Sequence, residues 1–504
     1  AARLRPAPQH LSVSDAAQIM APAGGGHRRA LGTLILSGSN IIRLAIQLAM
    51  LPVLARLIGP SEYGVVALAV PLVLFCNMLA DGGLGQALAR RRQVSAELES
   101  TVFWLAGAIG AGLALAAALM AWPAAAVLNE RRLGPLVLAL SPILVMSGFT
   151  AAANARIIRE GRFGVFAAGD LISVTASSAA AVAAALAGWG AWSLVAQQLV
   201  LWSCKFLWVG AMARVPVTRT CRPSLAADLL RFGRDIIGAN LADFVTRNAG
   251  NVIIGAVLGS LLLGWYAMAY QIARIPDLVI SGPIGLYVLT AFARIADEGR
   301  QAAAGLARAT LRLGFAALAP IFCGLGLVAD IAVDLVLGHK WAPAAPVLTA
   351  LCLAGFAFSL CSMVAAIFMG LGRSELQLRL SAIAGAVTVA TVAVFAHQGL
   401  VAIAWAVAAA TALVALGYLA VVARVLRLAL RQIAAAALPA VTGAGALAIA
   451  VLTAREALVS APSYVALPAL ILAGGGAYAA VLGLLFRSEV KADVKTLLAA
   501  HAEA

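Results

Sequence analysis

Long apolar stretches recur along this chain of 504 residues, and they limit its possible folds more than any other feature. A helix that crosses a lipid bilayer needs roughly 20 mainly apolar residues, and about fourteen stretches reach that length. They are continuous and rich in Ala, Leu and Val, which is typical of spanning helices and not of alternating barrel strands. The predicted spans are 31–55, 64–88, 100–127, 133–155, 163–187, 190–212, 234–258, 263–290, 308–336, 344–370, 376–396, 399–422, 433–453 and 464–486. We therefore predict an all-α polytopic membrane protein.

Composition excludes a soluble globular protein. The chain is 63% hydrophobic and only 11% charged, whereas soluble domains average about 45–50% apolar and about 25% charged residues. No single soluble core buries this much apolar surface, so the surrounding solvent must be lipid.

The basic residues indicate a topology rather than a nucleic-acid partner. Lys and Arg outnumber Asp and Glu by 36 to 21, and most of them fall in every second loop. Basic residues gather in this way on cytoplasmic loops because they resist translocation. The bias predicts an even number of helices and both termini in the cytoplasm. We expect the chain to lie in the inner membrane.

The N-terminus and the cysteines indicate no further chemistry. Residues 1–30 are rich in Ala, Pro, Gly and Arg, and are expected to form a disordered cytoplasmic tail. The first apolar stretch carries Arg43 and is too long for a cleavable signal. The six cysteines contain no CxxC pair and are interpreted as small apolar residues. We predict neither a metal site nor a cofactor.

A weak internal repeat divides the chain. Residues 57–69 read LIGPSEYGVVALA and residues 257–269 read VLGSLLLGWYAMA. At an offset of 200, Gly59 matches Gly259 and Gly64 matches Gly264. Both segments join the first and second helices of a half, and six predicted helices separate them. The two halves are therefore predicted to have the same orientation in the membrane.

This repeat predicts two lobes of six helices each, followed by two extra helices. The predicted organisation is a tail at 1–30, an N-lobe at 31–212, a cytoplasmic linker at 213–232, a C-lobe at 233–422, and two helices with a cytoplasmic C-terminus at 423–504.

Three predicted helices carry stripes of polar residues spaced three or four apart, so each stripe shares one helix face. Asp, Lys or Arg at the centre of a membrane helix costs about 2.5–3.5 kcal/mol on insertion scales. We therefore expect the stripes to face an aqueous interior. They are Asn40, Arg43 and Gln47 in the first helix, Asn240, Asp243, Arg247 and Asn251 in the seventh, and Tyr266, Tyr270, Arg274 and Asp277 in the eighth.

The stripe residues also have a purely structural interpretation, in which they neutralise one another. Asp243 and Arg247 are four residues apart, and Arg274 and Asp277 are three apart, so each pair can form a salt bridge. The helix that carries Arg43 offers no carboxylate for such a pair.

Three other charges have simpler explanations. Lys205 lies about two turns from a cytoplasmic helix end and is expected to extend its ammonium group to the interface. Asp81 and Asp170 lie near cytoplasmic helix ends and are expected to be hydrated there.

Several enzyme classes lack their motifs. The sequence contains no GxxxxGK[ST] loop and no HExxH, so hydrolysis of ATP by this chain is not expected. No outer loop is long enough to form a domain, which disfavours membrane polymerases and ligases that act through large periplasmic loops. We predict that the chain is a transporter and not an enzyme.

Four segments resemble the polysaccharide-transport flippases of the multidrug/oligosaccharidyl-lipid/polysaccharide exporter superfamily, and the resemblance covers nearly the whole chain from about residue 31. These segments are ARLIGPSEYGVVALA at 55–69, ADGGLGQALARR at 80–91, VLGSLLLGWYAMAYQIARIP at 257–276 and MGLGRSELQLRLS at 369–381.

The resemblance implies a V-shaped fold with two six-helix lobes around a central cavity. It also implies a cargo, an undecaprenyl-diphosphate-linked oligosaccharide, which moves from the cytoplasmic to the periplasmic leaflet by alternating access. Related lipid II flippases hold the diphosphate with cavity arginines, and Arg43 and Arg274 are the matching candidates. From its stripe we add Arg247, and we expect Asn40, Gln47, Asn240 and Asn251 to contact the sugars.

The expected partners are the lipid-linked oligosaccharide, membrane lipids and the polysaccharide polymerase machinery, in a pathway that makes O-antigen or exopolysaccharide. One alternative is a cation-coupled multidrug antiporter of the same superfamily, in which Asp243 and Asp277 bind the proton or sodium ion. A further alternative is a membrane glycosyltransferase or polymerase, which would need an acidic catalytic cluster.

Overall fold

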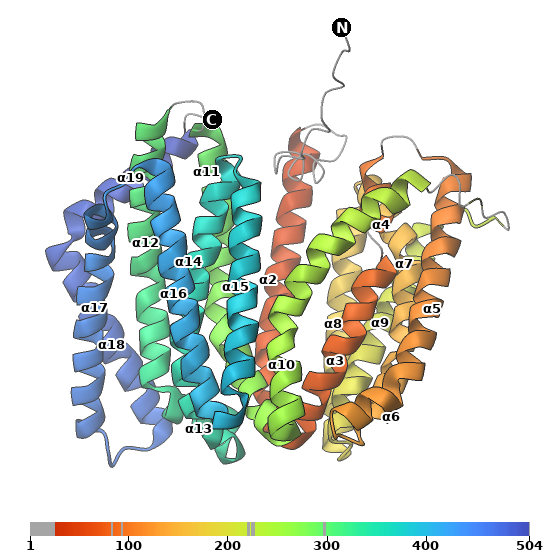
Figure 1. The fold of residues 1–504 in the computed structure, drawn as a ribbon, viewed down its shortest axis with the longest axis horizontal. Coiled ribbons are helices and arrows are strands. Elements are labelled where there is room, and N and C mark those ends of the chain that lie inside the picture. The colour runs from red at the N-terminus through yellow and green to blue at the C-terminus, as the bar shows by residue number, and fades with distance from the viewer. Residues whose placement is uncertain are drawn as a thin grey trace, which may run out of the picture. The chain divides into compact units, whose positions relative to one another are not determined.

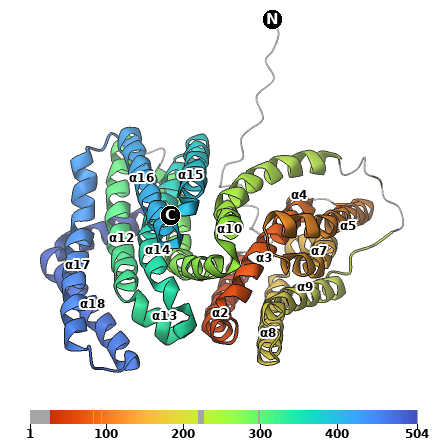
Figure 2. The ribbon, with the colours of Figure 1, turned by 60° about the horizontal axis from the view of Figure 1, so that its bottom comes forward.

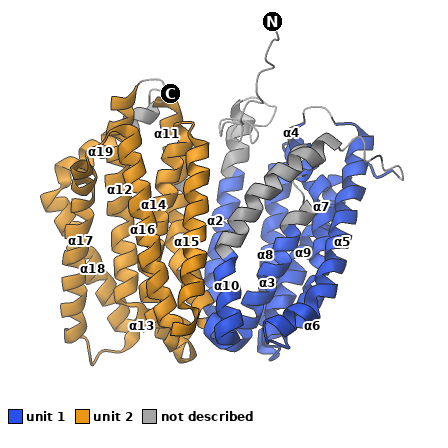
Figure 3. Cartoon of the chain, viewed as in Figure 1, with its two compact units in different colours: residues 1–264 blue, residues 265–504 orange. Residues whose placement is uncertain are grey.

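The computed structural model describes the backbone of residues 26–81, 84–91, 94–218, 222, 227–295 and 299–502. Within these ranges, side chains are described except at 26–34, 78–81, 86, 87, 90, 227–247, 283 and 498–502. Every regular element of the described residues is a helix (Figure 1), which confirms the predicted all-α fold. The chain divides into two compact units, residues 1–264 and 265–504 (Figure 3).

Unit 1 contains the first helices and most of a long broken one. Its elements are α2 (Gly26–Leu57), α3 (Pro60–Asp81), α4 (Leu84–Arg90), α5 (Ala96–Val127), α6 (Leu133–Leu140), α7 (Pro142–Arg159), α8 (Phe163–Leu186), α9 (Ala191–Ala213) and α10 (Ala227–Pro276) as far as Gly264.

Unit 2 contains the end of α10 and the remaining helices. Its elements are the π-helical turn η2 (Asp277–Ser281), α11 (Gly282–Ile295), α12 (Arg300–Leu327), α13 (Ala329–Leu337), the 3-10 turn η3 (His339–Ala344), α14 (Ala345–Gly370), α15 (Ser374–Phe395), the 3-10 turn η4 (Ala396–Gln398), α16 (Leu400–Leu426), α17 (Leu430–Ala457), α18 (Ser463–Leu485) and α19 (Arg487–Ala502).

Thirteen segments of the described chain are long and apolar enough to span a membrane, one fewer than the number of predicted stretches. The difference lies in the 48-residue segment Asn248–Ile295, which is more than twice the length that one crossing needs. Gly259 breaks the helix within it, with φ +83° and ψ 173°. Only glycine adopts such a conformation readily. The stretches predicted at 234–258 and 263–290 lie on either side of this break.

Close packing of apolar side chains, several of them small, holds unit 1 together. A core cluster joins α4, α5 and α7 through Leu88, Val102, Ala106 and Ala152, all of which are fully buried. Small side chains at such contacts let helix backbones approach closely, which is how helices associate where lipid weakens the hydrophobic effect. Helices α8 and α9 also pack against each other, and α2 packs against α8 (Figure 2).

In unit 2, the last two spanning helices, α17 and α18, lie at one edge and pack against α12. Figure 2 shows α17 and α18 beside α12. The hydroxyl of Tyr478 on α18 is buried and donates to the carbonyl oxygen of Ala316 on α12, at 2.8 Å. Leu447 and Val451 of α17 belong to one core cluster together with Tyr478. These contacts tie α17 and α18 to α12.

Helix α19 follows the last span and was not predicted. Arg312 of α12 pairs with its Glu489 at 2.8 Å and with its Asp493 at 3.3 Å. Burial raises the pKa of Asp493, an effect that Arg312 opposes. The docked helix explains why the side chain of Arg312 is mostly covered.

The paired glycines of the repeat contact each other. A Cβ atom on Gly64 would lie 1.7 Å from the carbonyl oxygen of Ser260, and one on Gly264 would lie 1.9 Å from that of Pro60. Position 260 is the repeat equivalent of position 60, so the two contacts are reciprocal. Reciprocal contacts of this kind are the signature of a two-fold relation. Locally, residues 60–64 and 260–264 pair as two equivalent copies.

Two predicted boundaries need correction. The tail was expected to reach residue 30, but α2 begins at Gly26, and residues 1–25 lie outside the described part. The linker was expected to reach residue 232, but α10 begins at Ala227 because the helix extends beyond its apolar segment. The lobe bounds at 31–212 and 233–422 stay a prediction.

Candidate functional site

Arg43 has no carboxylate partner among the residues that the structure describes. It lies on α2 with a half-buried side chain, and its Nη2 donates to Oδ1 of Asn40 at 3.2 Å. Its Nε is buried and makes no hydrogen bond to any described residue. Asn40 and Gln47 of the same stripe are exposed. The guanidinium group therefore keeps both its charge and a donor available for an anion.

Arg274 is also free of a carboxylate, within the described residues. Its guanidinium lies 5.7 Å from the centre of the Tyr270 ring, in a cation–π contact. Tyr270 stacks on Tyr266 with ring centres 6.2 Å apart. The two tyrosines thus give Arg274 an aromatic support that leaves its positive charge uncompensated.

Asp277 is bound elsewhere. Its Oδ1 accepts a hydrogen bond from Ser359 of α14 at 3.1 Å, and the described residues show no ion pair between Asp277 and Arg274. The π-helical turn η2 begins at Asp277, so the helical spacing changes just after Arg274. Such π-turns are often found at functional sites.

The stripe of the seventh predicted helix is only partly visible. The side chains of Asn240, Asp243 and Arg247 lie outside the described residues, although the backbone there is helical. Asn251 is half-buried on α10. Whether Asp243 pairs with Arg247 stays a prediction.

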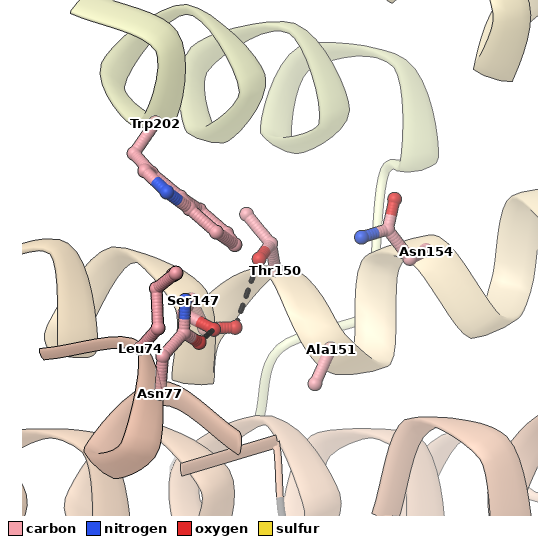
Figure 4. A pocket seen from close by; sticks show the side chains of 7 residues that line it. All are labelled: Leu74, Asn77, Ser147, Thr150, Ala151, Asn154 and Trp202. Carbon is pink, nitrogen blue, oxygen red and sulfur yellow. Dashed lines mark hydrogen bonds between the residues drawn. The ribbon is translucent and has the colours of Figure 1, made fainter. Parts of the chain in front are cut away.

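A polar cavity opens in unit 1 between α3, α7 and α9 (Figure 4). It was not predicted from the sequence. Its volume is about 370 Å³, within the range of about 300–1,000 Å³ for ligand pockets. Ser147 donates to Oδ1 of Asn77, and Thr150 donates to the carbonyl oxygen of Ser147 at 2.8 Å. Its lining consists of Leu74, Asn77, Ser147, Thr150, Ala151, Asn154 and Trp202.

The polar lining of α7 has a simple sequence signal. Ser147, Thr150 and Asn154 are spaced three and four residues apart, so they share one face of the helix. This stripe contains no charged residue, so the criterion that singled out the stripes of α2 and α10 does not apply to it. None of the site residues predicted from the sequence lines the cavity.

The predicted environments of Lys205 and Asp170 need correction. Instead of extending to the interface and being hydrated, they pair across α9 and α8, with Nζ to Oδ1 at 2.7 Å. Lys205 also lies 5.8 Å from the centre of the Trp202 ring. The Asp170 carboxylate compensates the charge of the partly buried Lys205 ammonium group inside the bundle, so this group need not reach the membrane interface. The side chain of Asp81 lies outside the described residues.

Two other arginines of unit 1, Arg156 and Arg159, share a buried glutamate. Glu99 of α5 is 2% exposed, and it pairs with Arg156 of α7 at 2.7 Å and also with Arg159. Arg156 pairs in addition with Glu160 at 2.8 Å. This cluster joins the ends of two helices.

A second cluster surrounds Arg132 at the opposite end of unit 1. Arg132 pairs with Glu62 at 2.9 Å and with Glu130 at 3.0 Å, and it donates to Ser260 at 3.3 Å. Glu62 also accepts from the backbone N–H of Ala191 at 3.0 Å. The hydrogen bond from Arg132 lowers the pKa of Glu130 despite partial burial. Arg132, in the loop between α5 and α6, therefore bridges α3 and α10.

The described residues contain no group of three His, Cys, Asp or Glu side chains that could hold a metal ion. Five of the six cysteines are described, and all five are free thiols, while Cys221 lies outside the described residues.

Comparison with known proteins gives consistent matches. The family described as "Polysaccharide biosynthesis protein" matches residues 53–346. The succinoglycan biosynthesis transport protein ExoT of Rhizobium meliloti is 28% identical over 371 residues, 74% of each chain. The lipopolysaccharide biosynthesis protein WzxC of Escherichia coli is 24% identical over 361 residues, which are 70% of this chain and 71% of WzxC.

Two kinds of solved structure share the fold. The lipid II flippase MurJ in an inward closed conformation matches with a TM-score of 0.73 and 11% identity, over 91% of this chain and 100% of MurJ. An inward-facing multidrug resistance MATE family transporter matches with a TM-score of 0.61 and 16% identity, over 79% of this chain and 98% of its own. At these identities the likeness concerns the fold alone.

Proposed function

Because the chain belongs to the polysaccharide biosynthesis protein family, we propose that it is a flippase for a lipid-linked saccharide. The proposed cargo is an undecaprenyl-diphosphate-linked oligosaccharide. It crosses the bacterial inner membrane from the cytoplasmic leaflet to the outer one, on the way to O-antigen or exopolysaccharide. The protein is then a transporter and not an enzyme, and polysaccharide polymerases use what it delivers.

The observation that carries this proposal is the pair of arginines without a carboxylate partner in the described part of the chain. Arg43 and Arg274 lie in membrane helices, where an unpaired arginine costs about 2.5–3.5 kcal/mol on insertion scales. An unpaired charge at such a cost suggests a ligand of opposite charge. Of the parts of the proposed cargo, only the diphosphate is strongly anionic.

Guanidinium groups suit this cargo chemically. A guanidinium donates two parallel hydrogen bonds to the oxygens of one phosphate, and it stays protonated at any physiological pH. In our proposal Arg43 and Arg274 bind the diphosphate, the sugars remain in a hydrated lumen, and the lipid tail stays in the bilayer. Asn40 and Gln47, which are exposed beside Arg43, and Asn240 and Asn251 of α10 are proposed to contact the sugars. Arg247 is proposed as a third phosphate ligand.

Affinity for the diphosphate must be limited, because the same groups release the cargo in the other leaflet. A ligand that binds equally well to both conformations shifts no equilibrium between them. The Tyr270 ring beside Arg274 stabilises the cation when no phosphate is bound. It thereby reduces the net gain from binding and supports release.

The alternative of a cation-coupled antiporter makes different demands. It needs a carboxylate that is open to a proton or sodium ion, and Asp277 is the described candidate from the sequence. Its hydrogen bond from Ser359 favours a structural role. Export of polysaccharide that survives Asp277→Asn while failing with Arg274→Ala supports the flippase. The reverse result supports the antiporter.

The decisive experiment deletes the gene and follows two products. We expect surface polysaccharide to disappear, while undecaprenyl-diphosphate-linked oligosaccharide accumulates on the cytoplasmic side of the inner membrane. Expression of the intact chain should restore export. Normal polysaccharide without accumulation of the lipid-linked intermediate contradicts the proposal.

The proposed topology has its own test. Single cysteines placed near Arg91 and near Arg300 should react with an impermeant reagent only from the cytoplasmic side. A cysteine near Lys340 should react from outside. Labelling near Arg300 from outside shows that the predicted number of crossings before that point is wrong by an odd number.

A further inference from the structure

The cavity of unit 1 contains hydrogen-bonding groups that no described residue uses. Asn77 is 8% exposed, and its amide makes one hydrogen bond, to Ser147. Whichever way that amide is turned, one of its ends remains without a partner in the described chain. The amide of Asn154 and the indole N–H of Trp202 have no described partner either. Asn77 is buried, while Asn154 and Trp202 are half-buried at the border of the cavity, so these groups can form hydrogen bonds with a polar occupant.

The charge of the cavity narrows the chemistry of that occupant. None of the described residues that line it carries a formal charge. Lys205 approaches the ring of Trp202, but Asp170 holds its ammonium group at 2.7 Å and neutralises it. A diphosphate or a drug cation in this cavity would lack a counter-charge and would lose its hydration, which is costly. A neutral molecule with several hydroxyl groups needs no counter-charge, and it can exchange its hydration for hydrogen bonds to the lining.

Trp202 supplies the second half of the recognition. Its ring borders the cavity across from Thr150 and Asn154 (Figure 4). The face of an indole ring is electron-rich, and the C–H groups on one face of a pyranose are electron-poor. Ring stacking together with amide and hydroxyl partners fits a sugar better than it fits a purely apolar molecule.

We propose that this cavity binds a neutral sugar residue of the cargo, with Trp202 as the stacking platform and Asn77 and Asn154 as hydrogen-bond partners. This inference rests on the proposed flippase function and deepens it. The arginines recognise the diphosphate that all such carriers share, and the cavity recognises the glycan. Trp202, Asn77 and Asn154 are thereby specificity-determining residues.

Two probes separate the two kinds of recognition. One is undecaprenyl diphosphate without sugars, and the other is the lipid-linked oligosaccharide extracted from cells that lack the gene. Binding of each radiolabelled lipid to the purified full-length protein in nanodiscs gives two affinities. We expect the intact protein to bind the glycosylated lipid about tenfold more tightly, the size of effect that one or two good polar contacts provide.

The variants are chosen to change only the contribution of the sugars to the affinity for the glycosylated lipid. Trp202→Ala and Asn154→Ala should each remove most of that preference and leave the affinity for undecaprenyl diphosphate unchanged. Trp202→Phe should retain part of it, because a ring remains. Trp192→Ala is the matched control, since Trp192 lies on the same helix, is 44% exposed and does not line the cavity. It should keep the full preference.

Each outcome has a distinct meaning. Equal affinity of the intact protein for both lipids overturns the inference, because the cavity then holds only water, while the flippase proposal stands. A preference that survives in both Trp202→Ala and Asn154→Ala overturns it as well. If neither lipid binds, the proposed function fails and the inference falls with it. Should Trp202→Ala not fold, Trp202→Phe and Asn154→Ala decide the question.

Discussion

Arg156 and Arg43 are both half-buried arginines on membrane helices of unit 1, but their charges are met in opposite ways. Arg156 pairs with Glu99 at 2.7 Å and with Glu160 at 2.8 Å. Arg43 has only the side-chain oxygen of Asn40 at 3.2 Å, and its Nε has no partner among the described residues. In unit 2, Arg312 forms an ion pair with Glu489 of α19. Among the described residues, Arg274 has no ion pair, and its guanidinium contacts the ring of Tyr270.

The contrast separates arginines that hold the fold from arginines that are free to bind. A buried ion pair that loses one partner leaves an uncompensated charge, so the paired arginines matter for stability. An arginine without a partner contributes little to folding and, in lipid, opposes it. Substitutions in the two groups should therefore separate stability from transport.

The largest expected effect is on transport. Arg43→Ala and Arg274→Ala should each abolish polysaccharide export while the protein inserts in normal amounts, because the diphosphate loses a paired hydrogen-bond donor. Lysine at either position should restore export only in part, since a point charge replaces a planar fork. Surface polysaccharide and protein level, measured in the same cells, test this. Full export by the double alanine variant would refute the proposed role of both arginines.

The next effect is on stability. Glu99→Gln leaves Arg156 and Arg159 without the buried carboxylate. We expect the free energy of unfolding to fall by roughly 3 kcal/mol, the lower end for a buried ion pair that loses one partner, because both arginines keep part of their hydration. The apparent melting temperature of the purified protein should fall clearly, while export per folded molecule is retained. Glu375→Gln is the control, because its contact with Arg379 is exposed on both sides and should be worth little. A similar drop in both variants would contradict the comparison.

A smaller effect is expected from glycine. In Gly64→Ala the new Cβ would lie 1.7 Å from the carbonyl oxygen of Ser260, so the backbone must move, at a cost of about 1–3 kcal/mol. Gly264→Ala should cost a similar amount because the contact is reciprocal. Gly112→Ala is the control, since a Cβ there meets nothing within 4 Å. Melting temperatures of the three variants would expose any asymmetry between the two copies.

The smallest effect concerns the exposed cluster at Arg132. The hydrogen bond from Arg132 lowers the pKa of Glu130 in the folded protein. Its stabilisation is therefore complete above the ordinary pKa of glutamate, about 4.3, and is lost as the pH falls through the lowered value. The expected size is below about 1 kcal/mol, because the side chain of Arg132 is 45% exposed. Melting temperatures from pH 7 down to pH 3 should fall less steeply for Arg132→Gln than for the intact protein.

The helices were predictable from sequence because each depends on a local property, a run of apolar residues long enough to span a membrane. Gly259 was predicted to lie between two helices for the same local reason. The start of α10 at Ala227 and the existence of α19 were missed, because neither segment is apolar. Helix α19 is instead held by Arg312 and by the backbone carbonyl oxygen of Leu497, which accepts from Tyr287.

The candidate site was less predictable, because pairing depends on the tertiary fold. Lys205 and Asp170 are 35 positions apart, and nothing local in either segment indicates that they form an ion pair. Likewise, Asp277 had Arg274 within reach on its own helix, but it accepts from Ser359 on another. The cavity depends on three helices, and only its α7 stripe, from Ser147 to Asn154, was visible in the sequence.

The reciprocal contact of Gly64 and Gly264 also imposes an order on biosynthesis. A ribosome adds about 5–20 residues per second, so roughly 10 to 40 seconds pass between these two glycines. During that interval Glu62 can first find Arg132 and then the amide of Ala191, while the place of Ser260 stays empty. The contacts at the beginning of α3 are therefore completed only after residues 260–264 have been synthesised.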